Sequence, residues 1–155
     1  SERFNLDYTM LRYGSLYGPR AQRWNGLRRY VEQVIREERL DYPGTGQERR
    51  EYVHVRDAAR LSVDVLNEQH RNQAVTITGS QVLSSKDLTA MIFEIAGIKE
   101  NITFTENART DDHYSITPYR YTPKKSNKLV PSEFVDLGQG VLELVEEIHR
   151  ENSAN

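Results

Sequence analysis

The sequence contains no cysteine, no long apolar run and no strong excess of either charge. The absence of cysteine excludes disulfide bonds and thiolate metal sites, and it fits a reducing compartment. No apolar stretch approaches the roughly 20 residues that a membrane-spanning helix needs. Lysine and arginine number 21 against 23 aspartates and glutamates, so the formal net charge is -2. This balance gives no indication of a polyanionic partner such as DNA.

The first residues, SERFNLDYT, show no charged-then-apolar signal pattern. We therefore expect a soluble, cytoplasmic protein that binds neither nucleic acid nor a membrane. The histidines lack the spacing of metal ligands, so we also expect no metal site. They stand at His54, His70, His113 and His149.

What the chain does contain is a regular alternation of apolar patterns. Its 155 residues suit one domain of ordinary size. Runs rich in β-branched and aromatic residues predict strands at residues 8–13, 52–55, 74–78 and 102–105. Apolar stripes with helical spacing predict helices around residues 27–35, 58–66, 88–96 and 137–148. This order is typical of an α/β fold, with residues 106–128 as a long loop or lid.

Capping residues mark the ends of these helices. Asn25 and Asp57 stand where the N-caps of the first and second helices are expected. Ser84 and Asp87 form the S-x-x-D pattern of a capping box before the third helix, and Gly97 is its expected C-cap. We therefore interpret Asp57 as a helix cap and not as a general base.

Two segments resemble motifs of a known family. Residues 11–20 (LRYGSLYGPR) resemble the L-R-Y-F-N-V-Y-G-P-R segment of the extended short-chain dehydrogenases, the nucleotide-sugar epimerases and dehydratases. Residues 42–59 (YPGTGQERREYVHVRDAA) resemble the family's G-x-G-x-x-x-R-D-Y/F-V/I-H/Y-V-x-D-V/L-A run. Weaker likenesses at residues 77–88, 109–112 and 136–140 extend the resemblance over nearly the whole chain, but only to the family's second half.

The resemblance implies a fold and its boundaries. Residues 1–155 would form the carboxyl-terminal, substrate-binding portion of an NAD(P)-binding Rossmann-type fold, with the last strands of the sheet plus a small substrate-binding domain. The dinucleotide fingerprint G-x-G-x-x-G is missing, because neither the Gly44 pair nor the Gly138 pair continues to a third glycine. We therefore expect the NAD-binding half to lie upstream of Ser1, outside this chain.

The catalytic pair is expected outside the chain as well. Family members use a helical Tyr-x-x-x-Lys pair, in which the lysine lowers the tyrosine pKa and the phenolate accepts a sugar hydroxyl proton. Tyr121 and Lys125 have this spacing, but Pro123 between them disfavours a helix. The pair also follows the substrate-loop motif instead of preceding residues 11–20. We therefore predict no catalytic residue in this sequence.

The resemblance implies that two arginines, Arg50 and Arg109, grip the substrate diphosphate from opposite sides. A guanidinium fork suits this role because it binds two phosphate oxygens at once. The alternative is that both are solvated surface arginines. Ser15 stands where the family has asparagine and would donate one bond to the sugar-proximal phosphate. Asp112, which ends the motif containing Arg109, is a further substrate-binding candidate.

Other candidates border the nucleotide. Asp41 and Pro43 match positions that line the base pocket, whereas Tyr42 between them would face the opposite way. Trp24 and Asn25, just before the first helix, would border the nucleotide or pack elsewhere on the protein.

NAD, or NADP, is the cofactor that the resemblance implies, held mainly by the absent half. Tyr13 would flank the nicotinamide, and Gly14 stands where the family has phenylalanine, at the wall between nicotinamide and sugar. Without the resemblance, Tyr13 is a strand aromatic and Gly14 belongs to a turn. His54 alternates with Tyr52 in a predicted strand, so we interpret it as structural.

For the intact enzyme, we expect epimerisation through a 4-keto intermediate after hydride transfer at sugar C4, or else dehydratase, decarboxylase or reductase chemistry. A non-catalytic nucleotide-sugar-binding or regulatory module is a separate alternative. A nucleic-acid-binding domain is disfavoured, because glutamates interleave with the arginines near the first helix and favour a solvated, ion-paired face. These arginines are Arg20, Arg23, Arg28, Arg29, Arg36 and Arg39. Exposed strand edges also predict a homo-oligomer.

Overall fold

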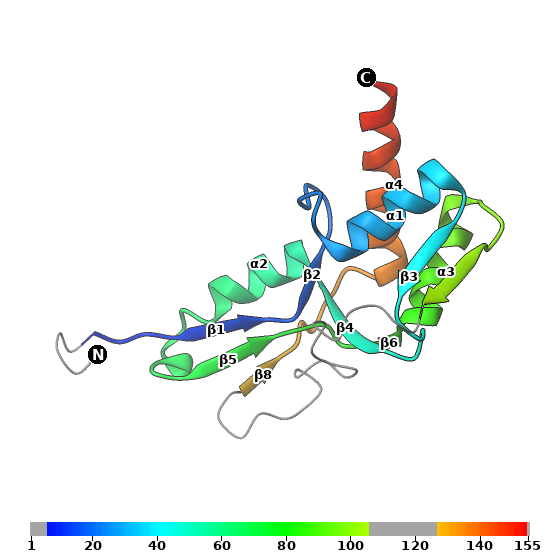
Figure 1. The fold of residues 1–155 in the computed structure, drawn as a ribbon. Coiled ribbons are helices and arrows are strands. Elements are labelled where there is room, and N and C mark those ends of the chain that lie inside the picture. Colours follow the sequence, from blue (N-terminus) through cyan, green and yellow to red (C-terminus); the bar gives the residue numbers. More distant parts are fainter. Residues whose placement is uncertain (1–5, 106–126, 155) are drawn as a thin grey trace.

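The computed structural model describes residues 6–105 and 127–154, and its elements form two lobes (Figure 1). The strands are β1 (Met10–Tyr13), β2 (Ser15–Tyr17), β3 (Leu40–Pro43), β4 (Arg49–His54), β5 (Ala74–Ile77), β6 (Val82–Ser84), β7 (Ile102–Thr105) and β8 (Asn127–Leu129). The helices are α1 (Gly26–Glu37), α2 (Val55–Asp64), α3 (Ser85–Ala96) and α4 (Leu137–Ser153), with a short 3-10 turn at Glu68–His70.

The first lobe is a parallel sheet in the order β1-β5-β8, with α2 packed along it (Figure 1). Tyr13 is in register with Ile77, which is in register with Leu129 on the other side. Parallel neighbours need a crossover connection, and α2 lies in the segment that links β1 to β5. The small core between helix and sheet consists of Val53, Ala58, Leu61, Val65, Val75 and Ile77.

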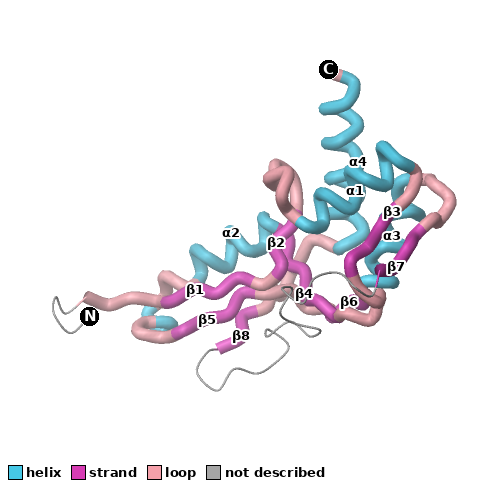
Figure 2. The backbone as a smooth tube through the Cα atoms, viewed as in Figure 1, coloured by secondary structure: helices cyan, strands magenta, loops and turns pink. Residues whose placement is uncertain are grey.

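The second lobe packs α1, α3 and α4 together with the parallel pair β3 and β7. Figure 2 shows these two strands side by side next to α3. The apolar stripes predicted from the sequence meet in its core, since a helix buries one face. Fully buried members include Val31, Val34, Leu40, Leu88, Ile92, Phe93, Leu144 and Ile148.

The strand β4 joins the two lobes. It pairs with β2 in parallel and with β6 in antiparallel register. Val53 belongs to the core of the first lobe, whereas Tyr52 packs against the core of the second. A side chain on β4 is therefore held in place by both cores.

Several sequence predictions are confirmed. The Asn25 side chain caps α1 by accepting the backbone N–H of Arg28 at 3.2 Å. Ser84 caps α3 by accepting the N–H of Asp87 at 3.1 Å. Gly97 ends α3 in the left-handed conformation, with φ of 68°. Tyr42 is buried while Asp41 and Pro43 are exposed, as strand alternation predicted.

The prediction that Asp57 caps the second helix is wrong. α2 begins at Val55, and its cap is His54, whose Nδ1 accepts the backbone N–H of Arg56 at 3.2 Å. Asp57 lies buried in the first turn, where its Oδ2 accepts the backbone N–H of Val135 at 2.9 Å. Asp57 thus ties α2 to the segment that precedes α4, because a carboxylate one turn into a helix can reach a neighbouring loop.

The other differences between the predicted and the observed secondary structure are short strands. β2 and β6 were not predicted as strands, β3 was treated only as a strand-like stretch at Asp41–Pro43, and Asn127 and Lys128 of β8 fall in the predicted loop. Each of these strands has only three or four residues. Their hydrogen-bond partners are distant in the sequence, so a local pattern of polar and apolar residues does not identify them.

Candidate functional site

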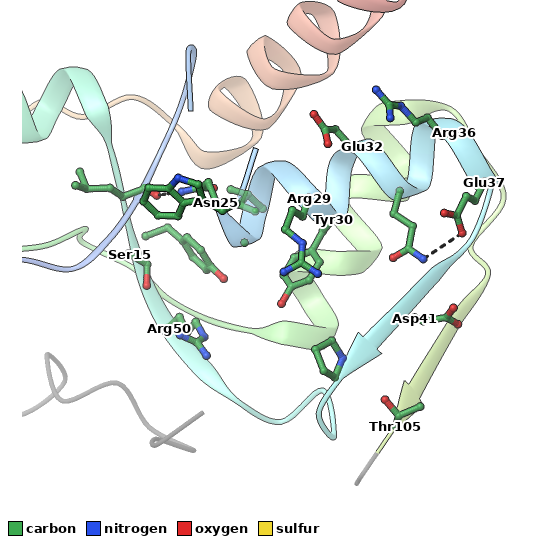
Figure 3. Close-up of a pocket in the computed structure, with 17 residues that line it drawn as sticks. Ser15, Asn25, Arg29, Tyr30, Glu32, Arg36, Glu37, Asp41, Arg50 and Thr105 are labelled. Carbon is green, nitrogen blue, oxygen red and sulfur yellow. Dashed lines mark hydrogen bonds between the residues drawn. The ribbon is translucent and has the colours of Figure 1, made fainter. Parts of the chain in front are cut away.

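A groove of about 1010 Å³ lies between α1 and the strands β2, β3 and β4. Four residues predicted to bind substrate line it together, namely Ser15, Asp41, Pro43 and Arg50. Figure 3 shows Ser15 and Arg50 toward one end, and Asp41 well away toward the other. Their role in binding stays a prediction, but the groove gives all four a common location.

The amino-terminal end of α1 opens onto this groove. Asn25 both caps the helix and donates from Nδ2 to the carbonyl oxygen of Leu16 at 2.9 Å, which fixes the first turn against β2. Gly26 and Leu27 also line the groove, and the first turn of α1 contains no acidic residue. The positive end of the helix dipole therefore lies at the groove without a carboxylate to neutralise it. Trp24 lines the same end and is 79% exposed.

The direction of Arg50 is set by the residue that follows it. Neighbouring side chains on a strand point to opposite faces, so Glu51 is buried while Arg50 is half-buried at the groove. The Glu51 carboxylate accepts hydrogen bonds from Thr78 Oγ1 at 3.0 Å and from Lys128 Nζ at 2.8 Å. These bonds tie β4 to β8 and to the residue that follows β5. They thereby hold the strand in the rotation that turns Arg50 toward the groove (Figure 3).

Arg50 brings unneutralised charge to the groove. Within the part of the chain that the structure describes, no carboxylate forms an ion pair with its guanidinium. Burial raises the pKa of the neighbouring Tyr52, and the positive charge of Arg50 opposes that rise. Tyr52 is therefore a neutral phenol near pH 7. The wall of the groove formed by β4 accordingly favours an anion.

The carboxylates that line the groove are each paired with an arginine. Glu32 Oε1 lies 3.0 Å from Arg28 Nε. Asp41 Oδ2 lies 3.0 Å from Arg39 Nη2, and Glu37 Oε2 lies 3.4 Å from Arg39 Nε. These ion pairs reduce the negative charge at the groove but do not cancel it, because Glu37 and Asp41 share the single charge of Arg39. Asp41 can still contact a ligand through its free carboxylate oxygen, but it does so as part of an ion pair.

The two predicted cofactor residues lie outside the groove. The Tyr13 hydroxyl shares a hydrogen bond of 2.7 Å with Ser62 Oγ of α2. Gly14 donates its N–H to Ile77 O at 2.8 Å, and a Cβ there would lie 2.8 Å from Thr78 Oγ1. The side chain of Thr78 therefore takes the space that a larger residue at position 14 would need. Both residues lie at the carboxyl end of β1, the edge of a parallel sheet at which ligands bind.

Part of the predicted site lies outside the described residues. This applies to Arg109 and Asp112, predicted to bind substrate, and to the Tyr121 and Lys125 pair. The convergence of Arg50 and Arg109 on one diphosphate therefore stays a prediction. Within residues 6–105 and 127–154, no group of three or more acidic, histidine or cysteine side chains could hold a metal ion. The described helices include none that is long and apolar enough to cross a membrane.

His54 forms a buried contact away from the groove. Its ring is 1% exposed and packs edge-on against Tyr17, with ring centroids 5.2 Å apart. Its Nδ1 accepts a hydrogen bond, so the proton of the neutral ring is on Nε2. That atom lies 3.5 Å from Glu143 Oε2, which is longer than a good hydrogen bond. Burial outweighs the attraction of Glu143 and lowers the pKa of His54.

The buried His54 predicts how stability depends on pH. In the unfolded chain it gains a proton near pH 6.5, whereas its lower pKa in the folded protein resists protonation. The free energy of unfolding is therefore expected to fall as the pH drops from about 6.5 toward the folded pKa. Urea unfolding at several pH values between about 7.5 and about 5.5 measures the free energy of unfolding above and below the pKa of an unfolded histidine, about 6.5.

His54→Asn should remove much of this dependence, because asparagine can still cap the helix but does not titrate. His149→Asn, at an exposed position of α4, is the matched control and should keep it. An unchanged pH dependence in His54→Asn would show that another group is responsible.

Comparisons with known proteins identify the family of this chain. The model of the NAD dependent epimerase/dehydratase family matches residues 1–78, just over half of the sequence. The chain belongs to this family. The resemblance of its two main motifs to the extended short-chain dehydrogenases is thereby confirmed.

Two curated members of the family are distant relatives. An uncharacterized UDP-glucose epimerase, YtcB, of Bacillus subtilis is 26% identical over 104 residues, which cover 66% of this chain and 33% of that protein. A dTDP-glucose 4,6-dehydratase of Streptomyces griseus is 26% identical over 150 residues, which cover 96% of this chain and 44% of that protein. The chain thus spans less than half the length of these two relatives.

Solved structures of the family share the fold. The UDP-glucose 4-epimerase of Thermotoga maritima with UDP-glucose has a TM-score of 0.76 and 23% identity, covering 97% of this chain and 48% of that one. The UDP-glucuronic acid 4-epimerase of Bacillus cereus with UDP-glucuronic acid and NAD has a TM-score of 0.71 and 20% identity, covering 92% and 45%. The predicted α/β fold of a Rossmann-type family member is confirmed.

Proposed function

We propose that this chain binds the diphosphate of a nucleotide sugar in the groove between α1 and β4. The observation that carries the proposal is Arg50, a guanidinium at the groove without an ion-pair partner among the described residues. A diphosphate supplies the anionic oxygens that such a group binds in pairs. Solved relatives hold UDP-glucose and UDP-glucuronic acid, which contain this group.

The order of residues along the groove supports an orientation for the ligand. Ser15 lies at the same end as Arg50, where its hydroxyl would donate to the sugar-proximal phosphate (Figure 3). Asp41 lies toward the other end, where the base would bind, and Pro43 lines the same groove (Figure 3). We propose that Arg109 and Asp112 complete the substrate site.

The whole protein is proposed to be an epimerase that works through a 4-keto sugar, with dehydratase, decarboxylase or reductase chemistry as the alternative. NAD, when bound, would accept the hydride from sugar C4. The residues present fit only part of its site, because Tyr13 and Gly14 can form a wall at the carboxyl end of β1 but the glycine fingerprint is absent. We propose that residues outside this sequence hold most of the cofactor and supply the proton-transfer pair.

We also propose that the chain forms a homo-oligomer. Among the described strands, β1 has a neighbour only on the side of β5, so its other edge is open. Leu6, Tyr8 and Met10, on β1 or just before it, are each at least 47% exposed. Open edges with apolar side chains favour association.

Arg50→Ala is expected to weaken binding of UDP about 10- to 100-fold, because hydrogen bonds to charged groups contribute about 1.5–3 kcal/mol. Titration calorimetry with UDP and UDP-glucose measures the affinity. Arg23→Ala is the matched control, since Arg23 is exposed and does not line this groove. Equal affinity for Arg50→Ala and the unchanged chain would contradict the proposal.

A further inference from the structure

A second guanidinium lies at the same groove, on the wall opposite β4. Arg29 extends from α1 toward the groove, and Arg50 reaches it from β4 (Figure 3). The sequence pattern placed Arg29 in a solvated, ion-paired face of the first helix. Of the other arginines of that face only Arg36 also lines the groove; it lies far from Arg50 (Figure 3), and its Nη2 donates to Asn152 Oδ1 at 3.4 Å.

Arg29 does not take part in the ion pairs of α1. Glu32 is the acidic residue at the i+3 position of Arg29, and such residues often pair on a helix. Here the Glu32 carboxylate is bound by Arg28 at 3.0 Å instead. Arg28 turns away from the groove and also binds Glu147 at 2.8 Å. In the described ranges 6–105 and 127–154, the Arg29 side chain has no ion-pair partner.

Three sources of positive potential therefore meet at one groove. Arg29 and Arg50 supply full charges from two different elements, and the amino-terminal end of α1 adds its dipole. Arg28 and Arg39 pair with the carboxylates that line the groove and thereby weaken their opposition to this potential. A diphosphate has two phosphoryl groups, so the guanidinium on each wall can bind the oxygens of a different phosphorus atom, which a monophosphate does not offer.

We infer that Arg29 is a second phosphate-binding arginine, which faces Arg50 across the groove and makes the site selective for a nucleoside diphosphate over a monophosphate. The inference rests on the proposed function, because it assumes that the groove binds a nucleotide. The inference does not depend on the position of Arg109. It assigns a binding role to a residue that neither of the two main motifs includes.

The test compares three ligands with a stepwise change in charge: uridine, UMP and UDP. Titration calorimetry is run on the unchanged chain, Arg29→Ala, Arg50→Ala and the control Arg23→Ala. Arg29→Ala is expected to lose at least tenfold in affinity for UDP and at most about threefold for uridine, which carries no phosphate. The preference for UDP over UMP should shrink accordingly. Arg29→Lys keeps the charge and should recover part of the UDP affinity.

The outcomes separate the two proposals. If Arg50→Ala weakens UDP binding but Arg29→Ala does not, the role of Arg29 is overturned and the proposed function stands. An equal loss of uridine and UDP affinity in Arg29→Ala would also overturn it, because a phosphate contact cannot affect uridine. If the unchanged chain binds none of the three ligands, both proposals fail. Thermal unfolding of each variant verifies that α1 is intact.

Discussion

Gly79→Ala is expected to lower the free energy of unfolding by about 3 kcal/mol, at the upper end for an overpacked site. Gly79 is buried where the segment after β5 crosses β4, and an added Cβ would overlap the backbone carbonyl oxygen of Tyr52. A backbone atom cannot move aside as a flexible side chain can, so β4 must shift. Since β4 joins the two cores and carries Arg50, the shift should also weaken ligand binding.

Thermal and urea unfolding measure this loss, which corresponds to a decrease of about 6–12 °C in Tm for a chain of this size. Gly26→Ala is the matched control. A Cβ at Gly26 meets no atom within 4 Å, so that variant should keep its stability. Equal stability of the two variants would show that β4 and the Gly79 segment are less tightly packed than the structure indicates.

Arg28→Ala is expected to cost about 3 kcal/mol, as for other buried ion pairs that lose one partner. The Arg28 side chain is 3% exposed and binds Glu32 at 3.0 Å, Glu147 at 2.8 Å and Glu151 at 2.6 Å. Its removal leaves three carboxylates crowded between α1 and α4, where they repel one another. The helix that forms one wall of the groove would lose its main polar contact with α4.

Urea unfolding at low and at high salt distinguishes repulsion from lost packing. The cost of Arg28→Ala should decrease in 1 M NaCl, because the Debye length there is only about 3 Å. Arg28→Met retains most of the side-chain volume but not the charge, so it should be nearly as unstable as Arg28→Ala at low salt. If Arg28→Met is as stable as the unchanged chain, the ion pairs contribute little.

The sequence predicted the four main helices and the strands β1, β4, β5 and β7, but it missed the shortest strands, for a physical reason. Helices are specified by periodic stripes and by local caps, so Asn25 and Ser84 could be assigned from their neighbours alone. The cap of α2 was misassigned because histidine at position 54 accepts the helical N–H through its ring nitrogen, a less common cap than aspartate. Strands such as β2 and β8 depend on partners far away in the chain.

The residues of the candidate site were predicted from family motifs, and these motifs include only some of the residues that line the groove. Ser15 and Arg50 were identified because they stand at recognisable positions. Arg28 and Arg29 are identical in type and adjacent, so no sequence pattern distinguishes them. Their difference emerges only when α4 brings Glu147 and Glu151 beside Arg28 and leaves Arg29 at the groove.

The most direct test of the groove is an NMR titration of the nitrogen-15-labelled chain with UDP. We expect the Arg50 side-chain Nε–H signal and the backbone amides of Ser15, Gly26 and Leu27 to shift together and to saturate, because these groups line the same groove. Signals from the Arg20 and Arg150 region, which lies at a separate cavity, should stay unchanged. Shifts confined to that region, with no change at Arg50, would contradict the assignment of the groove as the nucleotide-sugar site.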